Sequence, residues 1–187
     1  HQQFLVVGSG DQSIHLLENR HGTLVRTLEK RIPELGTQYC RSITLHQGLL
    51  HFVGNEDIVI YRVERGSVSA TGQVIHLPKN YQGSNDIFFL GSRRGIFTST
   101  PQKAFLFSSL DELANGTAQD VSAAFRGTPY SVSRFDGRLW IPEITEYSAI
   151  RSYPFGGDSI SQASAQTLFD FGEPDSQSME RKRQIPT

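Results

Sequence analysis

The sequence has a single cysteine, Cys40, among its 187 residues, and this excludes an intramolecular disulfide framework. No apolar run approaches the roughly 18 residues that a helix needs to cross a bilayer, so we expect no membrane span. The formal net charge is −1, and such a balance lacks the electrostatic footprint of a general nucleic-acid binder. The 12 Phe, 6 Tyr and single Trp favour a packed domain over a disordered chain.

Short runs of β-branched and aromatic residues recur along the chain in pairs. The first members are residues 4–7, 49–53, 96–98 and 139–141, and the second members are residues 14–17, 60–63, 105–107 and 150–153. A polar or Gly-containing turn separates the members of each pair, as expected for strands joined by hairpins. The second members begin 46, 45 and 45 residues apart. Such constant spacing is typical of a repeat architecture.

Further strands complete the repeats. Opening strands are expected at residues 42–45, 86–89 and 131–133, and fourth strands at residues 73–77 and 166–169. Four antiparallel strands in about 45 residues describe the blade of a β-propeller. The sequence therefore predicts an all-β fold, a single propeller domain over residues 1–187. Its blades are expected at about residues 1–39, 40–83, 84–127 and 128–175, with one helical turn at residues 110–114.

The end of the chain leaves two ring arrangements open. Residues 176–179 lie 45 residues after residues 131–134 and therefore predict one more opening strand. Either residues 176–187 complete the first blade and close a four-bladed ring, or the chain is part of a six-bladed ring. Six blades at this period require about 270 residues. The number of blades thus becomes a test of the assignment.

Polar residues at the entries to the opening strands are the candidates for a site, because the opening strands of a propeller converge on its central channel. These entries contain Arg41, Asn85, Asp86, Thr128 and Asp175. Asn85 and Asp86 offer amide and carboxylate oxygens, which Ca²⁺ binds in sets of six to eight. Alternatively, the two side chains bond nearby backbone amides, or Arg41 pairs with Asp86 and makes the channel a satisfied polar core.

A family resemblance rests on this region. Residues 83–89, followed by residues 95–99, are similar to the calcium-binding blade of the paraoxonase/arylesterase family, in which an Asn-Asp-Ile run precedes a similar strand. Residues 131–153 resemble the following blade, and also the gluconolactonase-like and strictosidine-synthase-like propellers. The resemblance covers about residues 40–180. It implies a six-bladed propeller whose channel Ca²⁺ polarises a lactone or ester carbonyl and stabilises the developing oxyanion.

The resemblance also implies particular ligands. Asn85, Asp86 and Asp175 would be metal ligands, whereas Thr128 and Arg41 stand where the family has Asn and His. Two functions follow. One is a calcium-dependent lactone or aryl-ester hydrolase, or a degenerate descendant with an incomplete site. The other is a non-catalytic propeller that binds a protein partner through loops at one face, with Tyr81 and Tyr147 as exposed interface aromatics.

Smaller signals concern the compartment and single side chains. Asn115-Gly116-Thr117 fits the N-glycosylation pattern and predicts a secreted glycoprotein. Residues 181–183 resemble a basic processing site or form a solvated turn. Cys40 is expected to be a small buried hydrophobe, or a thiol whose pKa is lowered if Arg41 lies close. His51 alternates with apolar neighbours, so we expect it to face solvent or make one hydrogen bond.

Overall fold

The computed structural model describes residues 4–8 (backbone only), 13–64, 67–144, 148–155, 160 and 165–170. In this part of the chain the fold is all-β, as predicted, and consecutive strands form four antiparallel sheets. One short helix, α1 (Leu110–Asn115), coincides with the predicted helical turn. None of the helices in the described residues is long and apolar enough to cross a membrane.

Each sheet is built from neighbouring segments of the chain. The first contains β1 (Phe4–Gly8), β2 (Ser13–Arg20) and β3 (Thr23–Arg31); the second contains β4 (Ser42–His46), β5 (Leu49–Val53), β6 (Asp57–Glu64) and β7 (Ser67–His76); the third contains β8 (Ser84–Phe89), β9 (Gly95–Ser99), β10 (Lys103–Phe107) and β11 (Gln119–Asp120); the fourth contains β12 (Thr128–Pro129), β13 (Ser133–Phe135), β14 (Arg138–Ile144), β15 (Ala149–Pro154) and β16 (Gln166–Asp170). Each sheet falls within one of the four residue ranges expected for a blade. The predicted strand after residue 175 lies outside the described residues.

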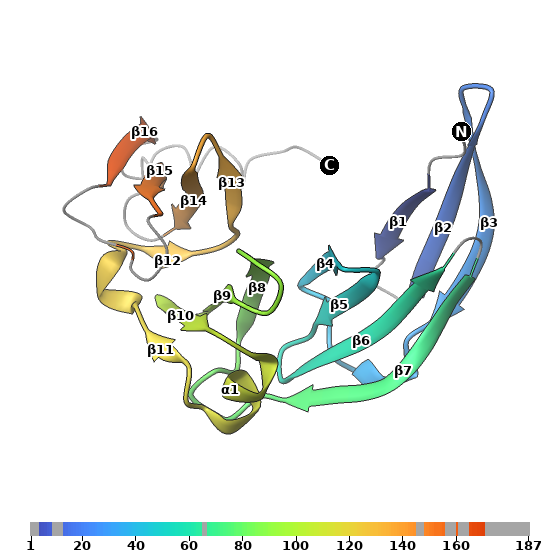
Figure 1. Cartoon of the computed structure of the whole chain (residues 1–187), viewed down its shortest axis with the longest axis horizontal. Helices are drawn as coiled ribbons and strands as arrows, with labels where there is room; N and C mark the ends of the chain where they lie inside the picture. Colours follow the sequence, from blue (N-terminus) through green and yellow to red (C-terminus); the bar gives the residue numbers. More distant parts are fainter. Residues whose placement is uncertain are drawn as a thin grey trace, which may run out of the picture.

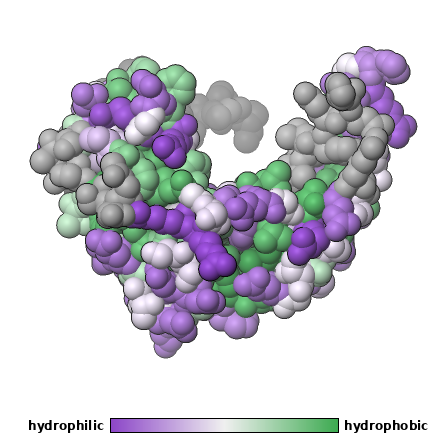
Figure 2. All heavy atoms as spheres, in the orientation of Figure 1, coloured by the Kyte–Doolittle hydropathy of each residue, from purple (hydrophilic) through white to green (hydrophobic). Residues whose placement is uncertain are grey.

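The four sheets follow one another along an open arc (Figure 1). The strands β4, β8 and β13 lie toward the hollow of the arc, and β3, β7 and β11 lie on its outside. The first and fourth sheets stand at opposite ends, and no described strand of one pairs with a described strand of the other. The space-filling view shows the same hollow, open on one side (Figure 2).

Two-residue turns set the register of the inner hairpins. Asp136 and Gly137, between β13 and β14, have φ angles of 49° and 69°. Gln47 and Gly48, between β4 and β5, have φ angles of 50° and 75°. Positive φ at both central residues matches the right-handed twist of the strands that follow, which explains the Asp-Gly hairpin predicted from the sequence.

Apolar side chains fill the space between neighbouring sheets. Between the second and third sheets, Tyr81 is 1% exposed and its ring lies 4.0 Å from that of Phe105. Its hydroxyl donates to the carbonyl oxygen of Ala118 at 3.3 Å. The prediction that Tyr81 is an exposed interface residue is therefore wrong, because its ring fills a gap in the core. Tyr147 lies outside the described residues.

Candidate functional site

The entries to the inner strands meet in one cavity, as the sequence predicts. This cavity, about 420 Å³ in volume, is called the inner pocket; its lining residues are Tyr39, Cys40, Arg41, Ser42, Asn85, Asp86, Tyr130 and Ser131. Three of the predicted site residues thus share one pocket. Thr128 is buried beside it, and its hydroxyl accepts the N–H of Gln102 at 3.2 Å. Asp175 lies outside the described residues.

Asn85 connects the third sheet to the fourth. Its Nδ2 donates to the carbonyl oxygen of Pro129 at 3.2 Å, and its Oδ1 accepts the hydroxyl of Thr100 at 3.1 Å. Only 8% of the residue is exposed. A buried amide needs partners for both its donor and its acceptor, and here the protein supplies both. Asn85 therefore fixes the relative position of two sheets.

Asp86 makes a second connection at the same place. Its Oδ2 accepts the N–H of Val132 at 3.0 Å, and its Oδ1 accepts the N–H of Ile87 at 2.9 Å. Burial raises the pKa of this carboxyl, although its backbone hydrogen bonds act in the opposite direction. The expected bond to a nearby amide is found only between Asp86 and Ile87; the other bonds of Asp86 and Asn85 go to Val132, Pro129 and Thr100.

These contacts do not form a calcium site by themselves. The described part of the inner pocket supplies one carboxylate and one amide oxygen, and protein donors already bond to them. Ca²⁺ requires six to eight oxygens, and no group of three or more His, Cys, Asp or Glu side chains among the described residues is placed to hold a metal. Calcium binding stays a prediction that depends on the family resemblance.

The rim of the inner pocket is exposed, unlike its floor. Tyr39 is 69% exposed, Tyr130 is 47% exposed and Arg41 is also exposed. Their backbones are held in place: the N–H of Arg41 donates to Val53 at 2.7 Å, and that of Tyr130 donates to Pro142 at 3.0 Å. In the described residues Arg41 forms no ion pair with Asp86, so that predicted pairing is wrong. The arginine extends into solvent, and backbone amides satisfy the carboxylate in its place.

Cys40 has no nucleophilic character in this position. Burial raises the pKa of its thiol to about 11, and the Sγ donates to the carbonyl oxygen of Ser42 at 3.4 Å. The possibility of a lowered thiol pKa is wrong, because desolvation outweighs any effect of neighbouring Arg41. At neutral pH the side chain is a protonated thiol, which attacks carbonyls poorly.

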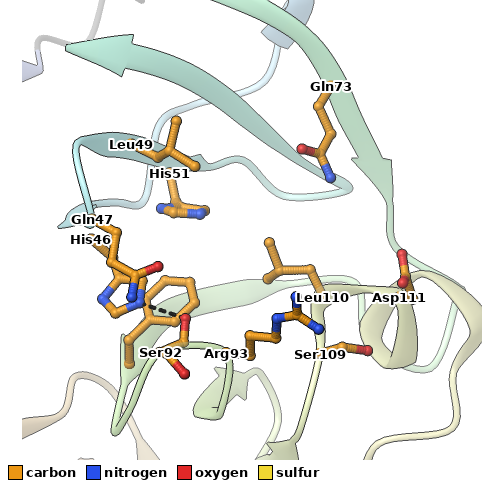
Figure 3. A pocket seen from close by; sticks show the side chains of 11 residues that line it. His46, Gln47, Leu49, His51, Gln73, Ser92, Arg93, Ser109, Leu110 and Asp111 are labelled. Carbon is orange, nitrogen blue, oxygen red and sulfur yellow. Dashed lines mark hydrogen bonds between the residues drawn. The ribbon is translucent and has the colours of Figure 1, made fainter. Parts of the chain in front are cut away.

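A second cavity, about 360 Å³ in volume, lies between the second and third sheets (Figure 3). The ring of His46 stacks on Phe89 with centroids 4.0 Å apart, and its Nε2 lies 2.9 Å from the carbonyl oxygen of Ser92. His51 is 2% exposed, and burial lowers its pKa. Its Nδ1 lies 3.4 Å from the carbonyl oxygen of Thr44. The expectation of one hydrogen bond holds for His51, whereas exposure to solvent is wrong.

Two features of the inner pocket were not predicted as site residues. Tyr130 belongs to the entry at residues 127–130 but was not named as a candidate, and Tyr39 directly precedes the entry at residues 40–42. Asn115, the predicted glycosylation residue, is exposed at the end of α1, where Gly116 has a left-handed φ of 69°. The sequon is therefore at the surface, while glycosylation and secretion stay predictions.

No family model matches the chain, and no curated protein matches it. The solved structure of Sqt1 from Saccharomyces cerevisiae is similar with a TM-score of 0.49 and 11% identity; the match covers 92% of this chain and 48% of Sqt1. The computationally designed protein Ika8 is similar with a TM-score of 0.47 and 10% identity, covering 91% of this chain and 46% of Ika8. The chain thus spans about half the length of either structure.

Proposed function

We propose that the chain is a segment of a β-propeller that acts as a non-catalytic binding module through the inner pocket. The proposal of a propeller is supported by four sequential antiparallel sheets, by the spacing of about 45 residues and by inner strands that face a common hollow. In propellers, the loops at one rim of such a hollow commonly contact partners.

One observation carries the binding function: two exposed tyrosines and an exposed arginine surround a rigid polar floor. Tyr and Arg are enriched among residues that dominate interface energies. Tyr39, Arg41 and Tyr130 keep their side chains accessible, while Asn85 and Asp86 are held by hydrogen bonds to the protein itself. The fitting partner is a protein segment with an acidic group for Arg41 and an apolar or aromatic group for the tyrosine rings.

A displayed library of random peptides provides the test. Peptides selected on the wild-type chain are expected to be rich in acidic and aromatic residues. They should lose binding to a Tyr39→Ala/Tyr130→Ala variant and, separately, to Arg41→Gln. The double variant Phe135→Ala/Phe169→Ala removes two other exposed aromatics and serves as the matched control. Peptides that bind the tyrosine variant and wild type equally well would contradict the proposal.

The calcium-dependent hydrolase is the second candidate. The observation in its favour is that Asn85 and Asp86, the ligands implied by the resemblance, do line a pocket. A melting curve in millimolar CaCl₂, compared with MgCl₂ at equal ionic strength, separates the two proposals. A rise in melting temperature that is specific to Ca²⁺ and absent from Asp86→Ala would favour the hydrolase. A melting temperature that is unchanged in Ca²⁺ would contradict the calcium dependence of the proposed hydrolase.

A further inference from the structure

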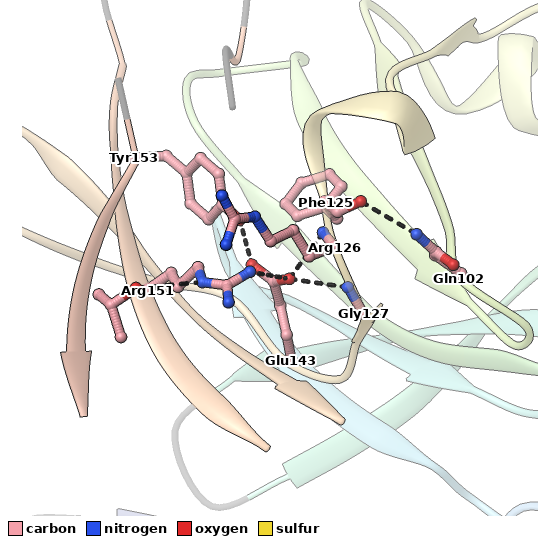
Figure 4. A network of polar contacts seen from close by, with 8 residues as sticks. Gln102, Phe125, Arg126, Gly127, Glu143, Arg151 and Tyr153 are labelled. Carbon is pink, nitrogen blue, oxygen red and sulfur yellow. Dashed lines mark hydrogen bonds and ion pairs between the residues drawn. The ribbon is translucent and has the colours of Figure 1, made fainter. Parts of the chain in front are cut away.

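A buried carboxylate organises the fourth sheet, away from the inner pocket (Figure 4). Glu143 is 1% exposed, and its Oε2 accepts the backbone N–H groups of Arg126 and Gly127 at 2.9 and 2.8 Å. The same oxygen accepts Nη1 of Arg151 at 3.0 Å, while the hydroxyl of Tyr153 donates to Oε1. Four donors therefore bond to Glu143, three of them to Oε2 and one to Oε1.

Arg151 has donors to spare. The residue is 8% exposed, and a guanidinium carries five N–H groups. In the described residues its side chain donates to Glu143 and, at 3.4 Å from Nε, to the hydroxyl of Thr167. Its side chain also hydrogen-bonds that of Tyr153. The guanidinium therefore keeps N–H groups beyond these contacts, and it lines a small cavity.

A second arginine lines the same small cavity. This cavity has a volume of about 50 Å³ and is lined by Arg126, Arg151, Ala165 and Thr167. The guanidinium of Arg126 forms no hydrogen bond or ion pair with another described residue, and in Figure 4 it lies beside the Glu143–Arg151 pair. Two arginines and one carboxylate leave the cluster with a net positive charge. Such a cluster favours an anion.

We propose that Arg126, Arg151 and Thr167 form a binding site for a tetrahedral oxyanion of the phosphate class. The guanidinium groups supply paired N–H donors that match phosphate oxygens, and Thr167 adds a hydroxyl. The cavity is small, about 50 Å³, which favours a compact anion over a bulky one. Arg126 is exposed, so a phosphomonoester enters with its organic part in solvent.

Calorimetric titration with inorganic phosphate at fixed ionic strength tests this site. Wild type is expected to bind phosphate, and Arg126→Gln should weaken binding by about tenfold, because it removes one charge-assisted contact. Arg134→Gln, which changes an exposed arginine of the same sheet, is the control and should bind like wild type. Thr167→Val should give a smaller loss. Arg126 and Thr167 are exposed, so both variants are expected to fold.

The titrations can overturn the proposed anion site in two ways. No heat of phosphate binding to wild type, or equal binding by the Arg126→Gln and Arg134→Gln variants, overturns the proposal. Phenyl phosphate distinguishes the sources of the anion: binding of both ligands supports a site for phosphomonoesters, and binding of inorganic phosphate alone supports a site for the free anion. A folded Arg126→Gln chain, checked by circular dichroism, ensures that lost binding reports on the site.

Discussion

Two buried carboxylates, Asp86 and Glu143, hold the third and fourth sheets in different ways. Asp86 is 9% exposed, and its two carboxylate oxygens accept one backbone N–H each. Glu143 is 1% exposed and accepts two backbone N–H groups, a guanidinium and a phenol. Glu143, the more deeply buried carboxylate, therefore has the positive charge of Arg151 beside it, whereas Asp86 has only neutral donors.

This difference explains their roles. Without a cation, burial raises the pKa of Asp86, and its side chain connects strand entries at the wall of a pocket. Glu143 instead neutralises Arg151, which would otherwise be an uncompensated charge in the interior. The same residue chemistry thus serves as an acceptor for backbone N–H groups in one place and as half of an ion pair in the other. The comparison predicts unequal costs when each carboxylate is removed.

The largest effect is expected at Glu143. Glu143→Ala leaves Arg151 buried and unpaired, and it also removes the acceptor of two backbone N–H groups. Breaking a buried pair by removing one partner costs about 3–5 kcal/mol. Urea denaturation measures the loss, with Glu29→Ala as control, because Glu29 pairs with Arg26 at the surface and should cost under about 1 kcal/mol. Equal losses in the two variants would contradict the role assigned to Glu143.

A smaller effect is expected at Asp86. Asp86→Asn keeps the shape of the side chain, but its NH₂ group then faces the N–H of either Val132 or Ile87. One buried donor loses its acceptor, at a cost of about 1–3 kcal/mol. Asp111→Asn, at an exposed residue of α1, is the matched control for the loss of a carboxylate. A stability equal to that of wild type would mean that the connection between the sheets contributes nothing.

The sequence predicts the sheets better than it predicts these connections. The runs at residues 49–53, 60–63 and 105–107 lie in β5, β6 and β10, because short runs rich in β-branched and aromatic residues with turns between them encode local pairing. In contrast, β3 was not predicted, since its burial pattern is mostly exposed and it has no clear apolar face. The two-residue strand β11 is too short to leave any pattern.

The site was predicted in position and only partly in chemistry. The period of the repeat brings Arg41, Asn85 and Asp86 together, whatever their partners are. The bonds to Pro129 and Val132 depend on how two sheets meet, which no local pattern contains. Glu143 did leave a signal. It lies two residues after Ile141 and four after Leu139, so the three side chains share one buried face of β14. Without the positions of Arg126 and Arg151, that signal indicates that Glu143 is buried but does not indicate what the carboxylate binds.

The smallest effect is a dependence on pH. Asp86 has a pKa of 3.8 when unperturbed, and burial raises it in the folded state. Below the unperturbed value of 3.8, Asp86 is protonated in both the folded and the unfolded chain, and the free energy of unfolding does not change with pH on its account. As pH rises through the raised folded value, the unfolded chain ionises more readily, and wild type loses stability. Asp86→Asn does not titrate, so the difference in stability between wild type and this variant should narrow as pH rises above about 4.

Urea midpoints of both chains across this range measure the gap. Glu143 and the surface carboxylates are present in both chains, so their titration cancels in the difference and Asp86 alone remains. A gap that widens toward neutral pH would mean that the amides of Val132 and Ile87 stabilise the ionised form by more than burial destabilises it. The contrast between a carboxylate held by backbone N–H groups and one held in an ion pair would then fail.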